Sequence, residues 1–241
     1  MSNLNSTPTN VRQNALDRSG ISRLIQVFGS MVIMGVVLFL AAGRLDWIAA
    51  WAYLVLNVLI VSTIGLYVGR RNPDVINERG KIGQSAKSWD KVVMILYTLT
   101  MFVLCIVAGL DAVRFGWTTM HVSVQVVGVV GLLLSMAITY WAMLSNPFLS
   151  TAVRIQEERG HQVVSTGPYR WVRHPMYVGV ILLWPSTALI LGSWWAVIPG
   201  LIISVIIVVR TALEDRMLQA ELPGYADYAK RVRQRLIPGV W

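Results

Sequence analysis

The sequence predicts an all-α integral membrane protein with about six transmembrane helices. Hydrophobic residues make up 55% of the 241-residue chain, charged residues make up only 14%, and the mean hydropathy is +0.58. A soluble domain normally carries about 25% charged residues. A helix that crosses a bilayer needs roughly 20 apolar residues. Segments that approach this length lie at 22–43, 48–69, 92–113, 122–144, 176–191 and 194–210.

The basic residues predict how these helices are oriented. All Lys and Arg residues except Arg44 and Arg114 lie within, or next to the ends of, four polar segments: 1–21, 70–91, 145–175 and 211–241. Basic residues accumulate on the cytoplasmic side of a membrane, so both termini are predicted to be cytoplasmic. The net charge of +9 then reflects orientation and attraction to anionic membrane lipids. Because no nucleic-acid-binding motif accompanies this charge, no nucleic-acid partner is expected.

The connections between the helices predict three regions. Residues 1–21 form a polar N-terminal tail, and residues 22–144 form a four-helix transmembrane region. Residues 145–241 contain a helical hairpin that turns at Leu191–Trp195, followed by a C-terminal tail. The expected location is a multi-pass position in a bacterial inner membrane or the endoplasmic reticulum.

The sequence lacks the motifs that several kinds of enzyme chemistry require. Cys105 is the only cysteine, which excludes an intrachain disulfide and argues against a thiolate metal site. The sequence has no HExxH pair, no GxSxG turn and no Walker loop, so zinc hydrolysis, serine hydrolysis and P-loop phosphoryl transfer are not expected. No metal site is predicted.

The polar side chains that could perform chemistry gather in two segments, 145–177 and 210–239. The hairpin between them returns the chain to the surface from which it left, so both segments are expected on the cytoplasmic face. They contain arginines, tyrosines, histidines and carboxylates. Arginine pairs with carboxylates, and aromatic rings stack on flat or cationic groups. Such a set suits S-adenosylmethionine beside a lipophilic substrate, and by residue type alone it also suits a nicotinamide cofactor.

Two motifs make the interpretation more specific. They are GPYRWVRHPMYVG (Gly167–Gly179) and, after the hairpin, RTALEDRMLQAELPGYADYAKRVRQRLIPG (Arg210–Gly239). Together they resemble the integral-membrane methyltransferases, which include isoprenylcysteine carboxyl methyltransferase and the phospholipid N-methyltransferases. The resemblance covers the C-terminal part of the chain, and the loop NPDVINERGKIGQSAKSWDK is similar to its counterpart in bacterial members.

The resemblance implies methyl transfer from S-adenosylmethionine, in a pocket that is built by the C-terminal half and open sideways to lipid. Glu214 matches the cofactor-binding acid, and Arg210 matches an arginine that faces the substrate and the reaction centre; these two are the predicted catalytic residues. Arg154 stands where some relatives have glutamine, and Asp215 completes a doublet that is often Glu-Glu. The other positions that match cofactor-binding residues are His161, Gln162, Val163, Val164, Tyr169, His174, Pro175, Met176 and Tyr177.

Structural interpretations remain open for several of these residues. Arg210 and Glu214 are four residues apart on a predicted helix, where a surface ion pair is common. Arg173 could contact lipid phosphates, and Tyr225 and Tyr228 could pack the tail against the protein. Asp111 is expected to pair with Arg114 at the outer membrane interface.

Two other functions and several methyl acceptors also remain open. The alternatives are a membrane NADPH-dependent sterol or enone reductase on a related scaffold and a non-catalytic membrane protein. The acceptor is a carboxylate, an amine or a thiol on a lipophilic molecule. A carboxylate could be oriented by Arg210, whereas an amine must lose a proton, for which His174 or Glu214 would be the nearest base.

Overall fold

The structure is a computed structural model that describes residues 15–71, 73–81 and 87–241. Predictions about residues 1–14 of the tail and about residues 72 and 82–86 of the loop lie outside the described residues. Every regular element in the described part of the chain is a helix. The long helices are α1 (Arg18–Ala42), α2 (Ile48–Arg71), α4 (Ser88–Gly109), α5 (Val122–Ser145), α6 (Pro175–Ile190) and α7 (Trp194–Glu221). The short helices are α3 (Pro73–Gly80), η1 (Leu110–Phe115), η2 (Glu157–Arg159), η3 (Gly167–Arg170) and α8 (Tyr225–Arg231).

Each predicted apolar segment is a helix, which confirms the all-α membrane fold. Within the described residues, five helices are long and apolar enough to cross a membrane, when η1 is counted as the end of α4, and α6 is a shorter apolar helix. Many large apolar side chains on these helices are exposed, such as Ile25, Leu40 and Val55, as expected for surfaces that face lipid tails. The number of spans and the side on which the termini lie stay predictions.

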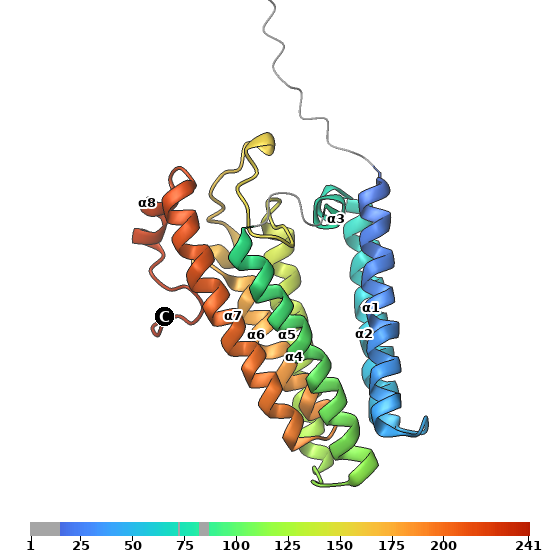
Figure 1. Cartoon of the computed structure of the whole chain (residues 1–241). Coiled ribbons are helices and arrows are strands. Elements are labelled where there is room, and N and C mark those ends of the chain that lie inside the picture. Colours follow the sequence, from blue (N-terminus) through green and yellow to red (C-terminus); the bar gives the residue numbers. More distant parts are fainter. Residues whose placement is uncertain (1–14, 72, 82–86) are drawn as a thin grey trace, which may run out of the picture.

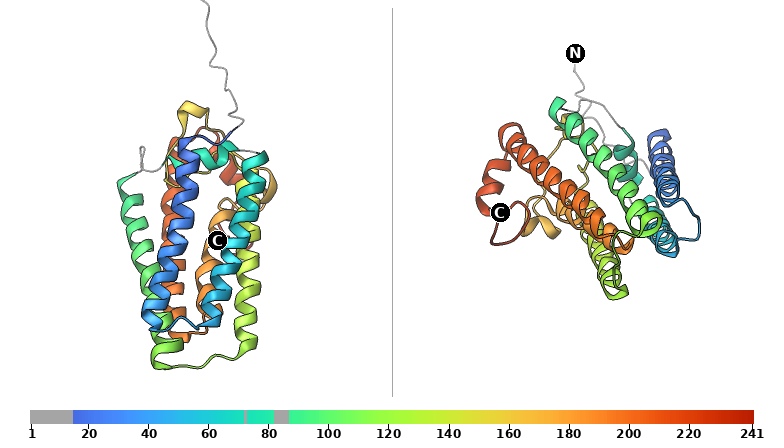
Figure 2. Two further views of the ribbon diagram at one scale, coloured as in Figure 1. Left: turned by 90° about the vertical axis from the view of Figure 1, so that its right-hand side faces the viewer. Right: turned by 60° about the horizontal axis from the view of Figure 1, so that its bottom comes forward.

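Helices α4–α7 form one bundle, and α1 and α2 lie beside it as an antiparallel pair (Figures 1 and 2). Helix α1 meets α4 closely at Gly109, where a Cβ atom would lie 2.7 Å from the Cβ of Ala41 and 2.8 Å from the backbone nitrogen of Ala42. The opposite ends of α1 and α2 lie farther from α5 and α6, and the short helix α3 is found there (Figure 1).

The α6–α7 hairpin turns where the sequence predicted. Ser193 caps α7 by accepting a hydrogen bond from the backbone nitrogen of Ala196 at 3.0 Å. Pro185 deprives the carbonyl of Ile181 of its usual partner within α6. Ser204 of α7 donates to that carbonyl at 2.9 Å, so a neighbouring helix satisfies the polar group that the proline leaves free.

The predicted pair between Asp111 and Arg114 is wrong. Asp111 is fully buried in η1, where it accepts hydrogen bonds from the hydroxyls of Thr118 and Ser193. It also accepts from the backbone nitrogen of Trp195 at 3.3 Å. A spacing of three residues places two side chains on one face of an α-helix, but η1 is a π-helix with a wider turn. Asp111 therefore joins the α4 end to the α6–α7 turn.

Candidate active site

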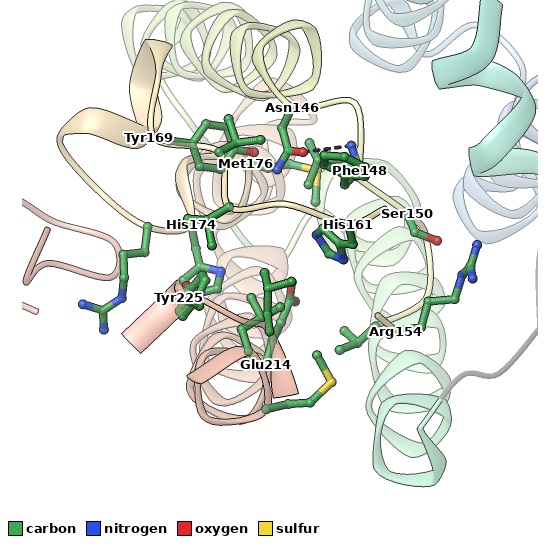
Figure 3. Close-up of a pocket in the computed structure, with 18 of the residues that line it drawn as sticks. Asn146, Phe148, Ser150, Arg154, His161, Tyr169, His174, Met176, Glu214 and Tyr225 are labelled. Carbon is green, nitrogen blue, oxygen red and sulfur yellow. Dashed lines mark hydrogen bonds between the residues drawn. The ribbon is translucent and has the colours of Figure 1, made fainter. Parts of the chain in front are cut away.

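A cleft lies at the end of the bundle that carries α3 and α8, between residues 146–177 and the last turns of α7. Figure 3 shows His161, His174 and Glu214 around this cleft, on three separate segments of the chain. Its walls come from the loop after α5, the start of α6, α7 and α8. The two polar segments that the sequence predicted to meet therefore do meet.

The loop after α5 is held in shape by buried polar contacts. Asn146 ends α5 and accepts a hydrogen bond from the backbone nitrogen of Phe148 at 2.9 Å (Figure 3). Gln156 is fully buried and donates to the carbonyl of Phe148, while Arg159 donates to the side chain of Gln156 at 2.7 Å. These contacts place the segment that follows, residues 161–164, along the wall of the cleft.

His161 is a neutral ring at the edge of the cleft. It stacks on Phe148 with 4.7 Å between ring centroids, and its Nδ1 accepts a hydrogen bond from the backbone nitrogen of Gln156 at 3.4 Å. Burial, together with the charges of Arg159 and Arg154, lowers the pKa of His161 to about 4. The ring therefore carries no charge at neutral pH, and it contributes an aromatic surface to the site.

The GPY segment forms η3 and packs against the end of α5. Gly167 has a φ of +59°, and a Cβ atom there would lie 2.4 Å from Oγ of Ser145. A side chain is thus excluded by both conformation and space. Tyr169 is buried, burial raises the pKa of its hydroxyl, and its carbonyl accepts a 2.6 Å hydrogen bond from Tyr228 of α8.

Asp215 is a fully buried carboxylate on which the C-terminal tail is assembled. Arg173 donates to both of its oxygens, at 2.7 and 2.9 Å. Arg235 donates to it at 2.8 Å, and the hydroxyl of Tyr225 donates at 3.1 Å. A ring nitrogen of His174 lies 3.2 Å from the same carboxylate.

Arg173 is the second part of this assembly. Its Nη1 donates to the carbonyls of Val232 and Arg233 at 2.7 and 2.8 Å, so one guanidinium joins the start of α6 to the tail. The neighbouring backbone nitrogens of Arg173 and His174 donate to the tail carbonyls of Gln234 and Arg235. The tail is therefore held by buried charge as well as by the packing of Tyr225 and Tyr228.

Glu214, the neighbour of Asp215, has a different environment. It lines the cleft and accepts a hydrogen bond from the hydroxyl of Tyr177. In the described part of the chain, no cation forms an ion pair with Glu214, whereas Asp215 pairs with Arg173 and Arg235. One acid of the doublet thus stabilises the fold, and the other presents its carboxylate to the cleft.

Arg210 does not pair with Glu214. It is buried, and its Nε and Nη2 donate to Asp90 of α4 at 2.8 and 3.2 Å. Nη2 also donates to the carbonyl of Thr151 at 3.0 Å. The guanidinium lies 5.4 Å from the ring centroid of Tyr177, directly behind the wall of the cleft. Nη1 has no hydrogen bond among residues 15–71, 73–81 and 87–241.

The structure brings most of the predicted site residues to this cleft. Pro175 and Arg210 are outside its wall: Pro175 begins α6, and Arg210 lies behind Tyr177. Arg154 also lines the cleft, but its guanidinium is paired with Glu158 and Glu78. The predicted residues that line the cleft are His161, Gln162, Val163, Val164, Tyr169, His174, Met176, Tyr177 and Glu214.

Sequence reasoning missed three residues that position this site. The sequence leaves Arg173 open between a lipid contact and a functional role, marks Asp215 only as a variant of a doublet, and does not single out Asp90. An available signal was their charge: a charged residue at the end of an apolar segment is costly to bury unless it has a partner. The identities of the partners, 42 residues apart for Arg173 and Asp215 and 120 for Arg210 and Asp90, come only from the fold.

One comparison with known proteins, that with family models, agrees with the motif resemblance. Residues 123–222 match the family model described as phospholipid methyltransferase, which confirms the resemblance over α5–α7 and the intervening loop. No curated protein matches the chain. A solved structure of the eukaryotic intramembrane Ras methyltransferase, isoprenylcysteine carboxyl methyltransferase, is similar over 91% of this chain and 100% of that chain, with 15% identity and a TM-score of 0.45.

Proposed function

Proceeding from the phospholipid methyltransferase match over residues 123–222, we propose that this membrane protein is a methyltransferase that moves a methyl group from S-adenosylmethionine to a lipophilic acceptor in the cleft beside α7. The observation that carries the proposal is the carboxylate of Glu214. This carboxylate faces the cleft and accepts a hydrogen bond from the Tyr177 hydroxyl. The carboxylate of its neighbour Asp215 is instead buried and paired with Arg173 and Arg235.

The chemistry of the lining residues fits the proposed cofactor. Glu214 can accept hydrogen bonds from an ammonium group or from ribose hydroxyls. Tyr169 and Tyr225 supply aromatic surface for an adenine ring, and the neutral ring of His161 adds to it without placing a positive charge beside a sulfonium. Met176 and Leu218 make part of the wall apolar. A polar cofactor with a purine and a cationic centre suits this combination.

S-adenosylmethionine, when bound, supplies an electrophilic methyl group on a sulfonium. The work of the chain is then positioning and exclusion of water, which together can contribute several kcal/mol to a transfer reaction. Tyr225 and Tyr228 close the cleft on the side of α8. Arg210 lies behind the ring of Tyr177, and its unused Nη1 is proposed to orient an oxygen of an acceptor that reaches this ring. Its other nitrogens are fixed by Asp90 and Thr151.

Binding of S-adenosylhomocysteine by the purified protein tests the proposed cofactor. Calorimetry is expected to detect binding of this product and not of NADPH. Glu214→Gln should weaken binding about 10- to 100-fold, because a hydrogen bond to a charged group is worth about 1.5–3 kcal/mol.

Glu221→Gln is the matched control. Glu221 lies on the same helix, but its side chain is 43% exposed and pairs with Lys87. The affinity of Glu221→Gln for S-adenosylhomocysteine should therefore stay within about twofold of that of the wild type. Binding of NADPH in place of S-adenosylhomocysteine would favour the reductase alternative. An equal loss of affinity in Glu214→Gln and Glu221→Gln would show that Glu214 is not part of the binding site.

A further inference from the structure

A second concave surface lies on the far side of α6 from the hairpin partner α7, between the N-terminal pair and the bundle. Its lining comes from α1, α2, α3, α5 and α6. Most of its walls are apolar, as at Leu24, Ile64 and Val180, and many neighbouring side chains of α1 and α2 are exposed. We call it the lateral groove. It includes residues of α1–α3, which lie outside the family-matched segment.

Two arginines lie in the lateral groove. Arg23 comes from the first turns of α1, Arg79 comes from the end of α3, and both are half-buried. Within the described residues no carboxylate interacts with either guanidinium. Burial is the main cause that lowers the pKa of Arg79 to about 10, and the positive charge of Arg23 lowers this pKa further. Two unpaired cations in an apolar groove raise the energy of the empty site, and a bound anion would lower it.

The fold holds Arg79 in place from both sides. The backbone of Gly80 packs against the start of α1, where a Cβ atom would lie 1.9 Å from the carbonyl oxygen of Ser19. The carbonyl of Arg79 accepts a 2.8 Å hydrogen bond from the hydroxyl of Thr151. The arginine is therefore on a fixed support between α1 and the loop of the candidate active site.

The lateral groove and the cofactor cleft meet at Met176. Nη1 of Arg79 lies 3.8 Å from Sδ of Met176, and Met176 lines the cleft. The positive charge of Arg210 also lowers the pKa of Arg79. A head group held by Arg79 would thus lie one side chain away from the site where the methyl group is transferred.

We propose that the lateral groove binds a membrane amphiphile, with the oxyanion of its head group between Arg23 and Arg79 and its apolar chain along α1, α2, α5 and α6. Charge complementarity selects an oxyanion, because two guanidinium groups from different helices can donate to several oxygens of one group. The apolar, lipid-facing walls select an amphiphile over a free anion. That this amphiphile is the methyl acceptor rests on the proposed function.

Binding of dodecyl phosphate in dodecyl maltoside micelles tests the proposal, measured by native mass spectrometry as a function of its mole fraction in the micelle. The wild type should bind it, and Arg23→Gln and Arg79→Gln should each weaken binding about tenfold, which corresponds to about 1.4 kcal/mol. Arg79→Lys keeps the charge and should recover part of the affinity. Inorganic phosphate, the free-anion probe, should bind far more weakly than dodecyl phosphate.

Arg71→Gln is the matched control, because Arg71 is an exposed arginine at the end of α2. Its affinity should stay within about twofold of the wild type. Unchanged binding in Arg23→Gln and Arg79→Gln would overturn the proposal, as would an equal loss in Arg71→Gln or equal binding of inorganic phosphate. Binding of S-adenosylhomocysteine is measured on the same samples. If it fails in the wild type, the proposed function fails, while the result for the lateral groove stands separately.

Discussion

Asp215→Asn is expected to destabilise the folded protein by about 3–5 kcal/mol, because it removes one partner from a buried group of charges. Asparagine keeps the shape of the side chain but leaves Arg173 without the carboxylate that its Nε and Nη2 contact. Arg235 and Tyr225 lose the same partner. Thermal unfolding in detergent should show a midpoint about 10 °C lower, and the tail should become sensitive to trypsin after Arg231, Arg233 and Arg235.

The control for this variant is Asp227→Asn on α8. Asp227 pairs with Lys230, but about three quarters of each side chain is exposed, so the variant should change stability by less than about 1 kcal/mol. If Asp215→Asn unfolds at the wild-type temperature and its tail resists trypsin as well as the wild type, Asp215 does not hold the tail as described.

Arg210→Gln should abolish most methyl transfer, but it also leaves Asp90 buried without its charged partner. The double variant Arg210→Gln/Asp90→Asn separates the two effects, because it removes both charges of the pair. The double variant is expected to recover stability to within about 1 kcal/mol of the wild type. Its methyl transfer should remain about 100-fold reduced or lower, as is typical when an oriented donor at a reaction centre is lost.

The single variant Asp90→Asn shows whether the orientation of Arg210 matters for activity. It keeps the guanidinium but weakens its anchor, and the amide oxygen of the new side chain can still accept from the backbone nitrogen of Val153, as Asp90 does at 2.9 Å. Methyl transfer between that of the wild type and that of the double variant is expected. Recovery of methyl transfer in the double variant to half the wild-type rate or more would assign Arg210 to the fold alone.

Much of the helix arrangement could be predicted from the sequence because it depends on local properties. Apolar runs of fixed length give the six helices, and Gly192 and Ser193 mark the turn of the hairpin. The same hairpin predicts that residues 145–177 and 210–239 meet at one end of the bundle. The motif around His174 then indicates which side chains line the cleft.

The charge network could not be predicted, since it depends on which elements pack together. The sequence offers Glu214 as the ion-pair partner of Arg210, yet its partner is Asp90 on α4. The doublet Glu214-Asp215 gave no sign that its two acids have opposite surroundings, one lining a cleft and one fully buried. Successive residues on a helix point about 100° apart, so only the packing of α6 and the tail decides which acid is enclosed.

The lateral groove also could not be predicted. Arg23 and Arg79 are 56 positions apart in the chain, and each resembles an ordinary basic residue next to a membrane-spanning segment. Helix α3 brings them into one groove by packing between α1 and the loop after α5. Their lack of an acidic partner among the described residues is a property of that packing.

The central claim is that the cleft with Glu214 transfers a methyl group from S-adenosylmethionine, and a labelling assay tests it most directly. Purified protein in nanodiscs that contain lipids of its own membrane is incubated with methyl-labelled S-adenosylmethionine, and label is counted in the lipid, protein and volatile fractions. We predict label in one of these fractions for the wild type and Glu221→Gln, together with an equal amount of S-adenosylhomocysteine, and a loss of at least tenfold in Glu214→Gln. No transfer by the wild type, or equal transfer by Glu214→Gln, would contradict the claim.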